Sequence, residues 1–333
     1  MSQGPRTLAY EPVQGWMQLP EGWSLVEVAG VAVDSRDRVY ILNRGQHPIV
    51  VFDRNGQFLG PWGQLTFRRP HGIFITQKDQ IFLVDDDGHT IYRCDPEGRI
   101  ELTLGTGQPS DTGYVPGKSP VQRAAGPFNT VTNVAVGPAG EIYAADGYGN
   151  ARVHKFSPDG RLLLSWGEPG IGEGQFNLPH GIAVDSQGLV YVADRENSRI
   201  QVFTPDGAFV RAWTWVNRPC EVFIDQHDTV FIAELGFLIG NPSVPHLRLM
   251  QQPPPGHSRI ARVSICTRDG EILAQLCGED PIRSGSFIAP HDLWVDSHGD
   301  LYVGEVVAAT GAVKALAPVT PPTLRKFVRR RSG

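Results

Sequence analysis

Short runs of alternating apolar and polar residues, separated by turns rich in glycine, proline and aspartate, cover most of the chain. Alternation over roughly four to eight residues is typical of a β-strand that buries one face. The runs recur in six similar units: an apolar strand, a turn, a strand of the type VYVAD, a polar turn, a strand of the type RIQVF, then a DG turn and a last strand. The units begin near residues 30, 71, 133, 180, 221 and 291.

Units of roughly 40 residues with four strands each are typical of β-propeller blades. We therefore predict an all-β fold, a six-bladed β-propeller formed as one domain by residues 1–333. The last unit ends after its third strand, LRKFV, so a strand from the N-terminal segment TLAYEPV is expected to close the ring. Strand direction places the start of each first strand and the end of each second strand on one face. Three insertions are expected to rise from that face as pocket walls: 105–128, 235–258 and 306–323.

Composition narrows the functional classes. The chain is 41% hydrophobic and 20% charged with a net charge of −5, so no nucleic-acid partner is expected, and the basic C-terminal RKFVRRR is interpreted as a solvated end. No apolar run approaches the roughly 20 residues that span a bilayer, and the N-terminus has no signal-peptide pattern. The four cysteines have no CxxC spacing and predict neither a disulfide framework nor a cysteine zinc site. We expect a cytoplasmic monomer with no membrane partner.

A Pro-His pair precedes the first strand of three units, in RRPHGIFIT, NLPHGIAVD and IAPHDLWVD. The histidines are His71, His180 and His291, which are separated by 109 and 111 residues and belong to the second, fourth and sixth units. In a six-bladed ring these units lie about 120° apart, and the first strands line the channel. The spacing therefore predicts that three imidazoles converge on the axis.

Three neutral imidazoles with an open fourth position are the ligand set of a catalytic zinc site. Fe²⁺, Co²⁺ and Ni²⁺ also accept imidazole, so the prediction is Zn²⁺ or another divalent transition metal. The alternative is a Pro-His turn repeated with the blade, whose histidines only cap the channel by hydrogen bonding. The other three units carry Ala29, Thr132 and Cys220 at this position, which weakens that alternative.

The second strands end in an acidic residue in five of the six units, and these carboxylates are interpreted as partners of the following turn. Arg44 and Tyr148 depart from this pattern, and Tyr148 lies in a glycine-flanked turn, GYGN. Beside a metal, the tyrosine would act as a base and the arginine would bind a substrate carboxylate. The alternatives are a tyrosine packed on the channel wall and an arginine paired with a neighbouring aspartate.

The motifs NRG, PHG, DGYGN, GQFNLPH, VADREN and APHD occur in this order along the chain. Together with the NHL-type blades, they resemble the peptidyl-α-hydroxyglycine α-amidating lyases, in a stand-alone bacterial form, and the resemblance extends from about residue 30 to residue 327. It implies a six-bladed propeller with zinc held by His71, His180 and His291.

The resemblance also implies roles for five further residues. A structural Ca²⁺ on the channel axis would be bound by the Asp292 carboxylate and the backbone carbonyls of Val31 and Ile73. Tyr148 corresponds to the catalytic tyrosine and Arg44 to the active-site arginine. In that family the tyrosine removes the proton of the substrate's α-hydroxyl group, and cleavage of the N–C bond releases an amide and glyoxylate.

The sequence departs from the family pattern at two positions. Ala289 stands where the animal enzymes have a methionine beside the site, and Gly149 replaces the cysteine of DGYCN. We also expect neither the disulfides of the secreted enzymes nor a copper monooxygenase domain. The chemistry can therefore be retained while the substrate need not be a secreted peptide.

The leading hypothesis is a metal-dependent carbon–nitrogen lyase that acts on a small-molecule or peptide-like substrate of the N-(α-hydroxy)acyl or α-hydroxyglycine type. The first alternative is a metal-dependent hydrolase of lactones, esters or phosphotriesters, since other six-bladed propellers do this around a channel-bound Ca²⁺. Three histidines favour the lyase, whereas a carboxylate and asparagine cage would favour the hydrolase. The second alternative is a non-catalytic NHL module that binds a protein.

Overall fold

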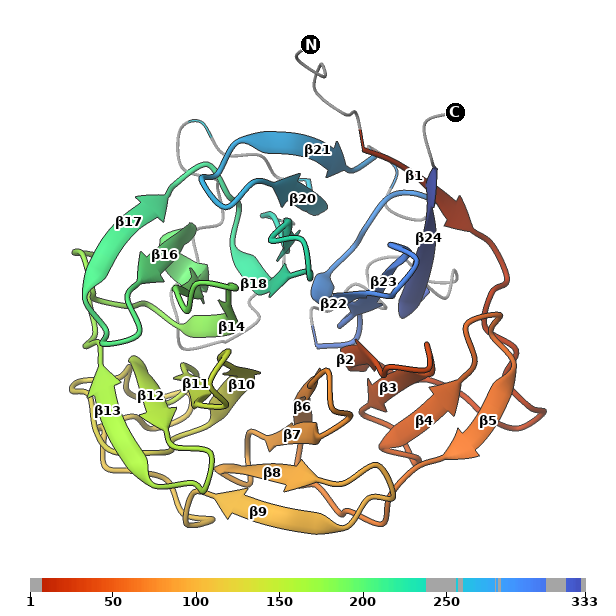
Figure 1. Cartoon of the computed structure of the whole chain (residues 1–333). Coiled ribbons are helices and arrows are strands. Elements are labelled where there is room, and N and C mark those ends of the chain that lie inside the picture. Colours follow the sequence, from red (N-terminus) through yellow and green to blue (C-terminus); the bar gives the residue numbers. More distant parts are fainter. Residues whose placement is uncertain are drawn as a thin grey trace.

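Six antiparallel sheets of four strands each form a ring around a central axis (Figure 1). The prediction of an all-β, six-bladed propeller is confirmed. The computed structural model describes residues 8–237, 256, 260–278, 280, 283–309 and 322–330.

The first three blades run outward from the axis in chain order. Blade 1 consists of β2 (Val28–Val33), β3 (Val39–Asn43), β4 (Ile49–Phe52) and β5 (Phe58–Pro61). Blade 2 consists of β6 (Pro70–Ile75), β7 (Ile81–Asp85), β8 (Thr90–Cys94) and β9 (Ile100–Leu104). Blade 3 consists of β10 (Val131–Val136), β11 (Ile142–Asp146), β12 (Arg152–Phe156) and β13 (Leu162–Trp166).

The other three blades follow the same order, and the last one takes its outer strand from the N-terminus. Blade 4 consists of β14 (Pro179–Val184), β15 (Val190–Asp194), β16 (Arg199–Phe203) and β17 (Phe209–Trp213). Blade 5 consists of β18 (Pro219–Ile224), β19 (Val230–Glu234), β20 (Arg262–Cys266) and β21 (Ile272–Leu276). Blade 6 consists of β22 (Pro290–Val295), β23 (Leu301–Glu305), β24 (Leu324–Arg330) and β1 (Ala9–Val13).

The N-terminal strand closes the ring, as predicted. β1 pairs with β24 in antiparallel register, from Ala9 opposite Arg330 to Val13 opposite Lys326. In Figure 1 the red β1 lies beside the blue β24. The closing blade therefore joins the two ends of the chain through backbone hydrogen bonds.

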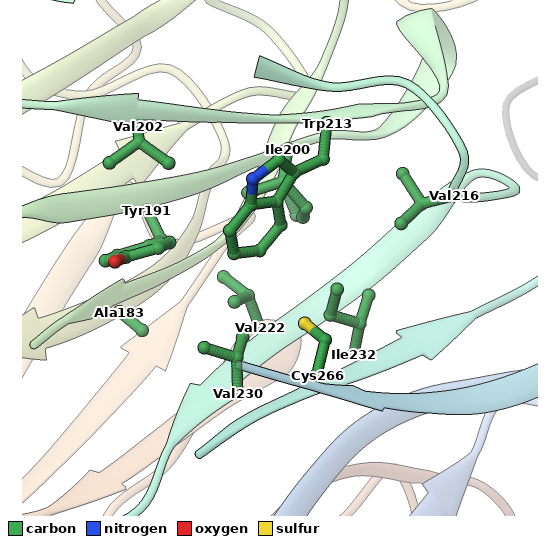
Figure 2. Close-up of a cluster of buried hydrophobic side chains, with 11 residues drawn as sticks. Ala183, Tyr191, Ile200, Val202, Trp213, Val216, Val222, Val230, Ile232 and Cys266 are labelled. Carbon is green, nitrogen blue, oxygen red and sulfur yellow. The ribbon is translucent and has the colours of Figure 1, made fainter. Parts of the chain in front are cut away.

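The apolar core lies between neighbouring blades. The inner strands β2 and β3 are buried along their whole length, whereas the outer strand β13 has exposed or half-buried residues throughout. Figure 2 shows one inter-blade cluster, in which Tyr191 and Trp213 of blade 4 lie with Val222 and Cys266 of blade 5. Burying a large apolar side chain contributes roughly 1.5–3 kcal/mol. Packing between blades thus holds each inner strand in place.

All six inner strands have a register irregularity at the same place. In β6, Pro70 pairs with Asp85 and Gly72 pairs with Val84, so His71 has no partner in the ladder. A β-bulge of this kind re-aims the extra residue and leaves its backbone groups outside the ladder. The corresponding residues of the other blades are Ala29, Thr132, His180 with Gly181, Cys220 and His291.

The insertion 105–128 packs on the turn between β11 and β12. The Thr112 hydroxyl donates a hydrogen bond of 2.6 Å to the Gly149 carbonyl, and the Ala125 N–H donates one of 3.3 Å to the Asn150 side chain. Most of the insertions at 235–258 and 306–323 lies outside the described residues.

Within the described part of the chain, the helical content is the short 3₁₀-helix η1 (Arg195–Asn197). No helix there has the length and apolar character needed to cross a membrane.

Candidate metal centre

Three histidines from alternate blades meet at the channel axis. His71 on β6, His180 on β14 and His291 on β22 are all buried. Their ring centroids are 4.9 Å apart for His71 and His180, 4.8 Å for His71 and His291, and 4.7 Å for His180 and His291. Each offers one ring nitrogen, and these three atoms lie within 4.8 Å of one another.

Each histidine makes a hydrogen bond from Nδ1 to the backbone carbonyl of the bulged residue in the next blade. A carbonyl oxygen can only accept, so Nδ1 carries the hydrogen and Nε2 keeps its lone pair. The Nδ1–O distances are 2.7 Å from His71 to Thr132, 2.8 Å from His180 to Cys220 and 2.8 Å from His291 to Ala29. The odd-numbered blades therefore fix the ring orientation of the histidines in the even-numbered blades.

The surroundings keep the three imidazoles neutral. Burial lowers the pKa of each histidine well below its ordinary value of 6.5. After burial, the largest contribution to the lowered pKa comes from His291 for His71, from Arg195 for His180 and from Arg44 for His291. Neutral imidazole is the form that binds a metal.

The donor set fits a divalent transition metal. Three Nε2 lone pairs converge, and the Tyr148 hydroxyl, with a single hydrogen, is the donor within hydrogen-bond distance of two of them in the described part of the chain. If the histidines only capped the channel by hydrogen bonding, their three Nε2 atoms would need more donors than one hydroxyl supplies. A cation with three nitrogen ligands and an open fourth position would satisfy all three lone pairs.

Tyr148 reaches the histidines from the turn between β11 and β12. Its hydroxyl oxygen lies 3.0 Å from Nε2 of His71 and 3.1 Å from Nε2 of His180. The guanidinium carbons of Arg69 and Arg195 each lie 5.5 Å from the centroid of its ring. The tyrosine oxygen is thus placed where a group bound at the open position would meet it.

The two glycines beside Tyr148 lie very close to neighbouring atoms. A Cβ at Gly147 would lie 1.9 Å from the backbone carbonyl oxygen of Pro179, and a Cβ at Gly149 would lie 2.2 Å from the side-chain oxygen of Asn129. Gly149 is one of the departures from the family motif, and this packing leaves no room for a side chain there.

Two arginines near the histidine cluster, Arg44 and Arg195, have N–H groups that make no hydrogen bond within the described residues. Arg44 donates from Nε to the Pro70 carbonyl at 3.1 Å and from Nη1 to Glu27 at 2.9 Å, so its ion-pair partner is a glutamate. Arg195 donates from Nε to Glu196 at 2.8 Å. In both arginines Nη2 is buried without a hydrogen-bond partner within the described residues. Orphaned buried donors of this kind are suited to an anionic ligand.

Asp86 brings a carboxylate to the edge of the cluster. Its side chain is fully buried, and Oδ2 lies 2.8 Å from Nη1 of Arg69 and 4.0 Å from Nε2 of His71. Burial raises the pKa of this carboxyl group to about 7, which the positive charge of Arg69 opposes.

The expected calcium ligands follow the bulged residues along the inner strands: Asp292 lies one position after His291, and Val31 and Ile73 lie two positions after Ala29 and His71. Asp292 accepts hydrogen bonds from the backbone N–H groups of Val31 at 3.0 Å and Leu293 at 2.7 Å. Burial raises the pKa of Asp292, and burial together with the charge of Asp292 raises the pKa of Glu221. A Cβ built on Gly30 would meet both Ile73 and Asp292, which places Ile73 beside this carboxylate.

Four residues near the two clusters were not singled out from the sequence: Asp86, Arg69, Arg195 and Glu221. Asp86 and Arg195 occupy the position that Arg44 occupies in blade 1, directly after the last residue of the second strand. Comparing that single position across the six units would have found both. Glu221 follows Cys220 as Asp292 follows His291, so the same comparison one residue along the inner strand would have found it.

Comparison with known proteins identifies the family. The sequence profile of the NHL repeat matches residues 176–203, which hold β14, β15 and β16 of blade 4. NHL repeat-containing protein 3 of Homo sapiens is 32% identical over 312 residues, covering 88% of this chain and 80% of the human protein. The chain belongs to the NHL repeat family.

This NHL-repeat protein is also similar to an enzyme. Peptidyl-alpha-hydroxyglycine alpha-amidating lyase 1 of Drosophila melanogaster is 34% identical over 287 residues, which is 81% of this chain but 46% of the Drosophila protein. Among solved structures, a streptogramin B lyase superposes with a TM-score of 0.56 over 99% of this chain and 100% of its own, at 11% identity. At that identity the similarity concerns the fold alone.

Proposed function

We propose that this NHL-repeat protein is a metal-dependent carbon–nitrogen lyase that cleaves α-hydroxyglycine-type substrates into an amide and glyoxylate. The observation that carries the proposal is the Tyr148 hydroxyl oxygen, which lies within 3.1 Å of the free ring nitrogens of both His71 and His180. The 34% identity to the Drosophila lyase supports the same class, although this chain spans less than half of that protein.

His71, His180 and His291 would hold the metal through Nε2. Bound Zn²⁺, or another divalent transition metal, supplies Lewis-acid chemistry at a substrate oxygen. The hydrogen bonds from Nδ1 to backbone carbonyls keep the three rings in the ligand tautomer and orientation.

Asp292 and the backbone carbonyls of Val31 and Ile73 would hold a structural Ca²⁺ on the axis. The burial of Asp292 and Glu221 close together supports a cation at this level, since each raises the energetic penalty of ionising the other. Calcium prefers oxygen ligands, and carboxylates and backbone carbonyls supply them.

In its phenolate form, which the positive charge of a bound metal would favour, Tyr148 would take the proton of the substrate hydroxyl. As this proton leaves, the hydroxyl oxygen forms the C=O bond of glyoxylate, the C–N bond breaks, and its electron pair stays on nitrogen. The nitrogen then takes up one proton to become the amide. Overall, one proton moves from the hydroxyl group to the nitrogen. The reaction therefore needs no oxidant, reductant or water.

Arg44 would bind the carboxylate of the substrate, and the structure adds Arg195 as a second cation. Both have a buried Nη2 group without a partner, and both face the histidine cluster. A carboxylate between two guanidinium groups would satisfy these donors and place the α-carbon near Tyr148.

Metal analysis and a glyoxylate assay on N-benzoyl-α-hydroxyglycine test this function together. We expect wild type to hold about one transition-metal ion per chain at the three-ligand site and to release glyoxylate, and we expect His180→Ala to lose both. His227→Ala is the matched control, because His227 is exposed and should leave both unchanged. Full metal occupancy in His180→Ala would exclude the proposed ligand set. A wild-type protein that holds metal and cleaves esters or lactones but releases no glyoxylate would be a hydrolase.

A further inference from the structure

The residue that follows the last position of the second strand differs in character around the ring. In each blade that last position belongs to a turn-forming residue; Asp85, for example, accepts hydrogen bonds from the backbone N–H groups of Arg68, Arg69 and Gly88 at 2.9–3.1 Å. The next residue differs from blade to blade. In blades 1 to 6 it is Arg44, Asp86, Gly147, Arg195, Leu235 and Val306.

Asp86 is the acidic member of this set, and its two oxygens have different surroundings. Oδ1 accepts a hydrogen bond of 2.7 Å from the backbone N–H of Asp87. Oδ2 accepts one of 2.8 Å from Nη1 of Arg69 and lies 4.0 Å from Nε2 of His71. Among acidic side chains of the described residues, Asp86 alone has an oxygen within 4.0 Å of a ring nitrogen of the three histidines. A carboxylate oxygen has two lone-pair sites, so Oδ2 can accept one more hydrogen bond at this point.

The α-hydroxyglycine unit of the proposed substrate has three polar groups, and the site has three matching partners. The carboxylate matches the free Nη2 donors of Arg44 and Arg195, and the hydroxyl group matches the Tyr148 oxygen. The third group is the amide N–H of the bond that breaks, which requires an acceptor. Oδ2 of Asp86 lies 4.0 Å from Nε2 of His71, and the Tyr148 hydroxyl oxygen lies 3.0 Å from the same atom. Both can therefore contact a substrate that is bound beside His71.

We propose that Asp86 accepts a hydrogen bond from the amide N–H of the scissile N–C bond, so that the site selects substrates whose nitrogen carries a hydrogen. This assignment rests on the proposed lyase function and concerns the substrate class of that reaction. Substrates whose amide nitrogen carries a hydrogen are accepted, and substrates with an alkyl group on that nitrogen are rejected. Arg69 is a positioning residue, whose Nη1 group holds Oδ2 of Asp86 in place.

Asp86→Asn tests the acceptor directly. Since Oδ1 of Asp86 already accepts from the Asp87 N–H, the oxygen of an asparagine is expected to keep that bond. Its NH₂ group would then take the place of Oδ2 and present a donor to both Arg69 and the substrate N–H. Asp87→Asn is the matched control, because Asp87 is the exposed neighbour and carries the same charge.

The experiment compares N-benzoyl-α-hydroxyglycine with its N-methyl counterpart, by glyoxylate release, in wild type and the variants. We expect Asp86→Asn to lower kcat/KM for the N–H compound by about 10- to 100-fold, because the buried substrate N–H would face a donor and lose its hydrogen-bond partner. The N-methyl compound should change less than about 3-fold, because it has no N–H to lose. Arg69→Met should show a smaller loss with the same preference, which provides a second test if Asp86→Asn folds poorly.

Four outcomes overturn the assignment. An equal fall on both compounds in Asp86→Asn would mean that Asp86 acts through some other step. Loss of the bound metal in Asp86→Asn would make Asp86 a metal ligand. Equal kcat/KM of wild type on the two compounds would exclude selection for N–H while leaving the lyase function intact. Release of no glyoxylate from either compound by wild type would contradict the proposed function itself, and the assignment with it.

Discussion

Nδ1 of His180 lies 2.8 Å from the backbone carbonyl oxygen of Cys220. Both residues are bulged out of the ladders of their strands, so the imidazole turns toward the axis and the carbonyl is free to accept. The same relationship joins His71 to Thr132 and His291 to Ala29. The candidate metal centre is therefore a ring of six bulges, in which three supply side chains and three supply backbone oxygens.

Cys220 takes part through its backbone, and its thiol should be unreactive. Burial raises the pKa of Cys220 and Cys94 to about 11 and that of Cys266 to about 12, so these thiols stay protonated at pH 8. Cys277 is exposed. We expect one fast-reacting thiol per native chain with a disulfide reagent such as DTNB, and four after denaturation. A second fast thiol in the native protein would contradict the packing around the inner strands.

The Tyr148→Phe variant should bind metal normally and lose most of its turnover. Removal of a general base lowers rates by roughly 10²- to 10⁴-fold, and the ring itself can still pack between Arg69 and Arg195. Glyoxylate release and metal content are measured on the same preparation. Near-normal kcat in Tyr148→Phe would remove this residue from the mechanism.

Gly147→Ala should disturb the site through its backbone. The new Cβ would lie 1.9 Å from the carbonyl oxygen of Pro179, the neighbour of His180, so the turn that carries Tyr148 has to shift. We expect destabilisation of about 1–3 kcal/mol and a fall in glyoxylate release. Gly126→Ala is the control, because a Cβ there meets nothing within 4 Å. Equal thermal stability of the two variants would contradict the described approach of the turn to β14.

The metal-free protein should lose stability in acid. Burial lowers the pKa of His71, His180 and His291 below 6.5, so the unfolded chain binds more protons than the folded chain below that pH. Stability then falls as the pH drops below the unfolded value, by at most about 4 kcal/mol per pH unit for three groups. Urea titrations of chelator-treated protein between pH 7.5 and pH 5 measure the slope. A triple His→Gln variant should show a shallower slope, and an identical slope would mean that other groups cause it.

The fold could be predicted almost completely from the sequence, because strand alternation and turn chemistry repeat in every unit. The convergence of His71, His180 and His291 followed from their spacing once the repeats formed a ring. The bulges could not be predicted, since a register shift depends on how two strands pair and leaves no residue signature. For the same reason the sequence does not show that the backbone carbonyl of Cys220 orients His180.

Asp86 and Arg195 could not be recognised from the sequence, because the acidic residues at the ends of the second strands were interpreted as turn residues. Asp86 stands in a run of three aspartates at the end of a strand, and such carboxylates usually hold the following turn. The structure separates them: Asp85 binds three backbone N–H groups, whereas Asp86 is turned toward His71. Arg195 belongs to VADREN and directly follows an acidic residue that was assigned to the turn, and its burial beside Tyr148 depends on how the blades pack.

X-ray absorption spectroscopy of the zinc-loaded protein tests the central claim most directly. Three imidazole ligands with an open position predict a shell of nitrogen scatterers at about 2.0–2.1 Å, with the multiple scattering typical of histidine and with no sulfur at about 2.3 Å. The signal should correspond to three imidazoles in wild type and to fewer in His291→Ala. A zinc shell of oxygen or sulfur scatterers, or a histidine signal unchanged by His291→Ala, would contradict the three-histidine metal centre.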